Sequence, residues 1–131
     1  DTNILVYSVD EKDKAKQHTA RDLIATWVQN DDAIISTQTL QVFYNAATKK
    51  LIASKKDAGT FVKQFSDIIP VHSNTVNDVL AAIDISEASQ LSFWDSLILA
   101  SAKACGCTTI YSEDLNDGQT INGVKVVNPF K

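Results

Sequence analysis

Apolar residues recur along the chain in two alternating patterns. Spacings of three and four residues predict amphipathic helices over residues 14–29, 36–51, a stretch after Ser54, 75–88 and 92–105. Short apolar runs predict strands at residues 33–36, 67–72, 108–111 and 124–127. The run at residues 4–9 is too short for periodicity to decide, so both a strand and a helix stay open there.

Polar residues and glycines mark where the predicted elements begin and end. Ser36 or Thr37, Ser54 and Ser92 can each accept a hydrogen bond from a first-turn N–H. Gly106 stands where a helix C-cap glycine belongs, and residues 116–118 predict a turn. Helices that alternate with short strands predict an α/β fold, with a central, largely parallel sheet flanked by helices on both sides. In such sheets, ligand sites lie beyond the carboxyl ends of the strands.

Length and composition limit the range of functions. The 131 residues suit one domain over residues 1–131, and because the sequence opens on Asp1 without Met, we expect its first strand to begin before Asp1. The net charge of −4 disfavours a domain that holds nucleic acid by a general basic surface. The absence of a membrane-length apolar run and of a signal peptide predicts a cytoplasmic protein with no membrane partner. Cys105 and Cys107 are expected to be ordinary buried or half-buried thiols rather than zinc ligands.

Acidic residues fall at strand exits and helix starts, although each also has a structural explanation. Asp1 could cap a turn, and Asp95 ends the capping-box sequence that starts at Ser92. Asp114 and Asp117 lie in ordinary turn sequences. Taken together, these carboxylates supply the oxygen ligands that Mg²⁺ prefers, drawn from separate loops. Paired metal ions held in this way can activate water and stabilise the leaving oxygen of a phosphodiester.

Four segments, in this order, resemble the PIN-domain family. They are DTNILVYS (residues 1–8), STQTLQVFYNAATKKL (36–51), SFWDSLILASAKACGCTTIYSEDLNDGQ (92–119) and GVKVVNPF (123–130). Within that family the chain is most similar to the VapC-type toxins of toxin–antitoxin pairs. The resemblance implies a Mg²⁺- or Mn²⁺-dependent endoribonuclease that acts on RNA, is blocked by a cognate antitoxin and forms a homodimer.

The family's functional residues can be carried over to matching positions of this sequence. The resemblance implies catalytic, metal-binding acids at Asp1, Asp95 and Asp114, a further metal ligand at Asp117, and supporting polar residues at Asn3 and Ser112. Supporting groups of this kind orient carboxylates through hydrogen bonds.

One position departs from the family pattern. The family usually places a glutamate where this chain has Val42, and the neighbouring Gln41 points about 100° away along a helix. Three interpretations stay open: a weakened or inactive member, replacement of the ligand by another acid or by water, and an inactivating substitution. The alternative to a nuclease is therefore an inactive binding module that still binds an antitoxin. A receiver domain or a dehalogenase-like phosphatase is disfavoured, because Asp1-Thr2-Asn3 lacks a D-x-D pattern and no lysine follows Tyr111.

Two further groups have competing interpretations. The lysines that cluster over two helices are expected to form a solvated face, with RNA steering as the alternative. These are Lys49, Lys50, Lys55, Lys56 and Lys63. Trp27 and Trp94 lie in helical apolar patterns, so we expect them to pack rather than to stack on bases.

Overall fold

A computed structural model describes residues 2–131 and shows six helices and five short strands in this range. The helices are α1 (Thr2–Val9), α2 (Lys14–Asn30), α3 (Thr37–Lys49), α4 (Lys55–Ile68), α5 (Val76–Ser89) and α6 (Phe93–Ala104). The strands are β1 (Ile35–Ser36), β2 (Val71–His72), β3 (Thr109–Tyr111), β4 (Thr120–Ile121) and β5 (Val124–Val127). The predicted α/β class is confirmed. No helix among the described residues is both long and apolar enough to span a bilayer.

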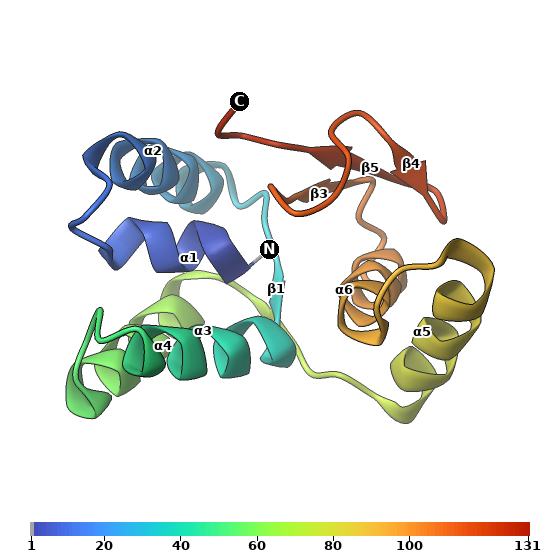
Figure 1. The fold of residues 1–131 in the computed structure, drawn as a ribbon, viewed down its shortest axis with the longest axis horizontal. Helices are drawn as coiled ribbons and strands as arrows, with labels where there is room; N and C mark the ends of the chain where they lie inside the picture. The colour runs from blue at the N-terminus through green and yellow to red at the C-terminus, as the bar shows by residue number, and fades with distance from the viewer. Residues whose placement is uncertain (1) are drawn as a thin grey trace. The chain divides into compact units, whose positions relative to one another are not determined.

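Packing divides the chain into two compact units. The N-terminal unit runs up to Val71 and includes Phe130, and the C-terminal unit comprises His72–Pro129 and Lys131. In the N-terminal unit, α1 packs against α2 on one side and α3 on the other, and α4 packs on α3 (Figure 1).

The core of the N-terminal unit explains why residues 4–9 form a helix. Ile4, Leu5 and Val6 are all buried, so α1 contributes apolar side chains to more than one neighbour. Phe43 of α3 is completely buried, and its ring meets the ring of Phe65 edge-on at 5.2 Å between centroids. A helix that is apolar on several faces is typical of a buried position.

The strand predicted over residues 67–72 is mostly wrong. α4 continues through Ile68, and the N–H of Ile69 donates to the carbonyl of Phe65 at 2.9 Å. Pro70 then prevents further helix, because its ring disfavours a helical conformation of the preceding residue. Only Val71–His72 remains as strand β2, which pairs with β1.

In the C-terminal unit, α5 and α6 lie side by side and the sheet β3-β5-β4 packs on α6 (Figure 1). β3 and β5 are parallel, with Thr109 opposite Lys125 and Tyr111 opposite Val127. Leu99 of α6 forms one apolar core with sheet residues that include Ile110 and Val126. The parallel pairing that the sequence predicts is therefore present between these two strands.

β4 is a strand that the sequence analysis missed. It runs antiparallel to β5, with Thr120 opposite Lys125 and Ile121 opposite Val124. The connecting residues Asn122 and Gly123 have φ values of 52° and 82°. An Asn-Gly pair with two positive φ angles is the strongest short-range signal for a tight β-hairpin. That signal was present in the sequence.

Candidate functional site

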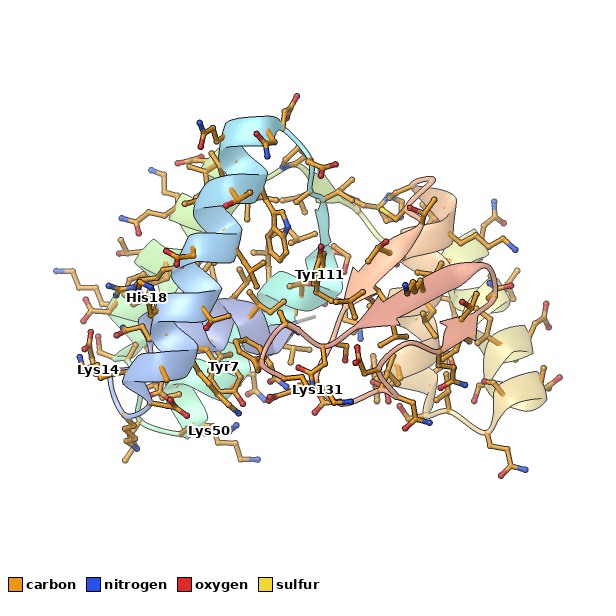
Figure 2. The ribbon with its side chains drawn as sticks, turned by 90° about the horizontal axis from the view of Figure 1, so that it is seen from above. Tyr7, Lys14, His18, Lys50, Tyr111 and Lys131 are labelled. Atoms are coloured by element: carbon orange, nitrogen blue, oxygen red, sulfur yellow. The ribbon has the colours of Figure 1, made fainter. Side chains whose placement is uncertain are left out.

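The loop that follows β3 is fixed by Ser112. Figure 2 shows Tyr111, the last residue of β3, and Ser112 comes directly after it. The N–H of Ser112 donates to the Val127 carbonyl at 2.9 Å, which continues the parallel pairing by one residue. The buried Ser112 hydroxyl accepts from the N–H of Asp114 at 3.1 Å. Asp114 itself is exposed, so the serine holds the backbone of an acid that faces water.

Asp95 lies in the first turn of α6 and is half-buried. The Ser92 hydroxyl accepts from the Asp95 N–H at 3.1 Å, so the predicted N-cap is confirmed. Only half of a capping box forms, because the Asp95 carboxylate makes no return bond to the N–H of Ser92 and has no other polar partner within residues 2–131. This carboxylate is available to a ligand, and the positive end of the helix stabilises its negative charge.

The carboxylate of Asp117 already has protein partners. Its Oδ1 accepts from the Asn128 N–H at 2.8 Å, and its Oδ2 lies 3.5 Å from the Lys131 ammonium. The hydrogen bond from the Asn128 N–H, together with the positive charge of Lys131, holds the pKa of Asp117 below its usual value. Asp117 therefore ties the end of β5 to the 116–118 turn. Its role as a metal ligand stays a prediction.

Asp117 makes part of the protein's stability dependent on pH. Because the folded pKa is depressed, the stabilisation is fully present above the unfolded value near 4 and is lost as pH falls through the folded value. We expect Asp117→Asn to lower stability at pH 7 and to flatten the acid side of the stability profile, as measured by urea unfolding between pH 7 and pH 3. Asp67→Asn removes an exposed carboxylate elsewhere and is the control. An equally steep profile in the Asp117 variant would contradict the expectation.

Two predicted positions lie in the N-terminal unit. Val42 is on α3 with 43% of its surface exposed, whereas its neighbour Phe43 is completely buried. Asn3 is half-buried on α1, which packs against α3. Gln41 is exposed as well. A longer acidic side chain at position 42 would keep its carboxylate in water, so it would meet little desolvation cost.

The predicted acids do not form a complete metal cage by themselves. Among residues 2–131 there is no group of three or more His, Cys, Asp or Glu side chains placed to hold a metal ion. Asp1 lies outside the described residues, and position 42 has no carboxylate. The donors that are described, Asp95 and Asp114, have the oxygen chemistry that hard divalent ions prefer. The role of these two acids as metal ligands stays a prediction.

Trp94, which was expected to be a packing residue, is 64% exposed and packs edge-on against Phe93. It occupies the second position of α6. Trp27 is half-buried. The two thiols are free and half-buried, and burial raises the pKa of both Cys105 and Cys107, as expected of unreactive cysteines. All five clustered lysines are exposed, which agrees with a solvated face.

An apolar surface pocket of about 520 Å³ lies in the N-terminal unit, where α2 faces α4. Arg21 is the one charged residue among its described lining residues, and Val28 and Ile68 stand partly exposed at it. Without a carboxylate, this pocket lacks the groups for metal-assisted hydrolysis. Its chemistry suits an apolar segment of another molecule. The sequence analysis did not find it, because the exposed apolar residues come from helices far apart in the chain.

The family model for the PIN domain matches residues 1–116 of the chain. The chain therefore belongs to the PIN-domain family, whose members are generally nucleases. The match includes Asp95 and Asp114 and ends before Asp117. No curated protein shows significant similarity to the chain.

Proposed function

We propose that this protein is a divalent-metal-dependent endoribonuclease of the VapC toxin class. The observation that carries the proposal is the Asp95 carboxylate, which the fold positions in the first turn of α6 and which has no polar partner among residues 2–131. A serine alone caps the helix, so the acid is not needed there for the cap. Asp95 lies within the PIN-domain match, and by resemblance it corresponds to a metal-binding acid of that family.

The remaining residues have complementary roles in this proposal. Asp1, Asp95 and Asp114 would provide carboxylate oxygens for Mg²⁺ or Mn²⁺. Ser112 would keep the loop of Asp114 in place through the N–H bond described above. Asn3 would orient a neighbouring carboxylate. When bound, the metal supplies charge stabilisation and activation of water for attack on the phosphodiester.

The competing proposal is an inactive module that keeps the fold and the antitoxin interface. Val42 favours it, because valine removes an oxygen donor from an exposed position of α3. The apolar pocket of α2 and α4 supports a protein partner under both proposals. A Mn²⁺ titration combined with an RNA cleavage assay separates them. Metal binding without cleavage, even after a glutamate is restored at position 42, would establish the module and refute the nuclease.

We further propose that the homodimer forms through one face of α5. Four aliphatic side chains at helical spacing are 37–75% exposed there: Val76, Val79, Leu80 and Ile83. A twofold axis would pair this stripe with itself in an antiparallel arrangement. Asp84 and Glu87 lie near the C-terminal end of their own helix, where the helix dipole disfavours negative charge. In the dimer they would lie beside the N-terminus of α5 in the second copy.

Leu80→Asp is expected to convert the dimer into a monomer, because each interface would bury two unpaired carboxylates. Light scattering coupled to size-exclusion chromatography should show the mass falling by half. Ile34→Asp changes a comparably exposed aliphatic residue in the N-terminal unit and should leave the mass unchanged. A monomeric starting protein, or a Leu80→Asp variant that remains dimeric, would refute this interface.

A further inference from the structure

Trp94 presents a large aromatic surface to solvent at the start of α6. Tryptophan is on average one of the more buried residues, yet 64% of Trp94 is exposed. The N-cap of α6 depends on Ser92 and not on the indole. An aromatic side chain that is left largely in water at a site of interest is a candidate for contact with a ligand.

The indole is held in a defined place although it is exposed. The ring of Phe93 meets it edge-on, with centroids 5.2 Å apart and planes at 79°. Phe93 in turn packs against the buried cluster that contains Ala82, Leu97 and Ala100. The first turn of α6 is fixed by its cap. A ligand that stacks on Trp94 would therefore lose little free energy to ordering the side chain.

We propose that Trp94 is a stacking platform for an unpaired base of the RNA substrate, an inference that rests on the proposed nuclease function. Trp94 directly precedes Asp95, whose carboxylate has no polar partner within residues 2–131. If a phosphate of the RNA is bound near Asp95, a base of the same strand would therefore lie within reach of the Trp94 indole. Single-stranded RNA is commonly recognised by bases that splay out and stack on aromatic side chains.

The surroundings of Trp94 favour a base over an apolar protein surface. Protein hot-spot tryptophans usually lie at the centre of a well-packed apolar patch. Along the chain, Trp94 follows the exposed Ser92 and the half-buried Phe93 and directly precedes the half-buried acid Asp95. A nucleobase matches this mixture, because it offers a flat face to the indole and polar edges to its neighbours. Stacking also contributes affinity where the net charge of −4 gives little general attraction to RNA.

The test measures the affinity of a fluorescein-labelled, ten-nucleotide single-stranded RNA for the protein in Mg²⁺, by fluorescence polarisation, with a gel to verify that the RNA stays intact. Trp94→Ala should weaken binding about five- to a hundredfold, the usual effect of removing one stacking partner. Trp94→Phe, which keeps an aromatic face, should recover most of the affinity. Ile34→Ala removes an exposed aliphatic side chain from the other unit and should change nothing.

An oligonucleotide of equal length with abasic sites identifies stacking as the cause. The starting protein should prefer the base-bearing RNA, and Trp94→Ala should lose most of that preference. The proposal would be overturned by undetectable RNA binding, by unchanged affinity in Trp94→Ala, or by an equal loss of affinity for both oligonucleotides. Unchanged affinity in Trp94→Ala would point to a protein partner for the indole. Cleavage by the Val42→Glu variant is a separate measurement. If the binding assay shows base stacking on Trp94 but RNA is not cleaved, only the proposed nuclease function is refuted. If RNA is cleaved but Trp94 shows no base stacking, only the stacking platform is refuted.

Discussion

Val42→Glu is expected to raise the rate of RNA cleavage at matched Mg²⁺ by about a hundredfold or more. Loss of even an indirect supporting group at a metal site costs about ten- to a hundredfold in metal affinity or activity, and a direct ligand contributes at least as much. The structure makes the substitution tolerable. Position 42 is 43% exposed on the surface of α3, so a glutamate there would not be buried without a partner. Initial rates on a labelled RNA, with and without chelator, measure the effect.

Val42→Gln provides the matched control. Glutamine has nearly the same shape as glutamate but no charge, and it is a poor ligand for a hard divalent ion. It should therefore leave cleavage at the level of the starting protein. Equal rates for all three proteins would remove the argument that Val42 has weakened a metal site. Equal gains from glutamate and glutamine would mean that polarity, not metal binding, limits the activity.

The elements that the sequence predicted well are those specified by local chemistry. Ser36, Ser54 and Ser92 cap their helices as expected, because a side-chain oxygen and a first-turn N–H three residues on need no distant partner. Gly106 follows α6 with a φ of 75°, a conformation that glycine adopts without strain. The amphipathic helices were also predicted well, because the spacing of their apolar residues can be read directly from the sequence.

The failures lie where distant contacts decide the outcome. Residues 67–68 look like part of a strand by composition, but α4 extends over them because Phe65 packs on Phe43, which belongs to another helix. The exposure of Trp94 has the same origin. Its place in an apolar pattern could not show that Phe93, and not Trp94, faces the core cluster of α5 and α6. Tertiary context overrides a local pattern in both cases.

The candidate site was predictable in its parts and not in its assembly. The sequence identified Asp95 and Asp114 and placed them correctly at a helix start and after a strand. It could not show that the Asp95 carboxylate has no polar partner among the described residues, while the Asp117 carboxylate holds Asn128 and Lys131. The two acids therefore differ in the hydrogen bonds that their carboxylates make. Hydrogen bonds to residues distant along the chain make that difference.

The unengaged Asp95 carboxylate leads to a second prediction with a large expected effect on cleavage. In the Val42→Glu background, Asp95→Asn should reduce RNA cleavage by at least about a hundredfold while leaving the free energy of unfolding nearly unchanged. The carboxylate would be lost as a metal ligand, but the cap would survive, since Ser92 accepts from the backbone N–H of residue 95. Cleavage rates and urea unfolding on the same preparation measure both quantities.

Asp78→Asn is the contrasting control, because Asp78 stands at the same position of α5 but its Oδ2 accepts two hydrogen bonds. Burial alone would raise the pKa of Asp78, yet bonds from the Thr75 N–H and from His72, at 2.9 Å and 2.7 Å, keep it below its usual value. Replacing this charged acceptor should cost about 1–2 kcal/mol of stability. Cleavage at a temperature where the variant is folded should be little affected. If instead Asp95→Asn proved as destabilising as Asp78→Asn, the Asp95 carboxylate would be a structural group, and the site proposed around it would lose its central ligand.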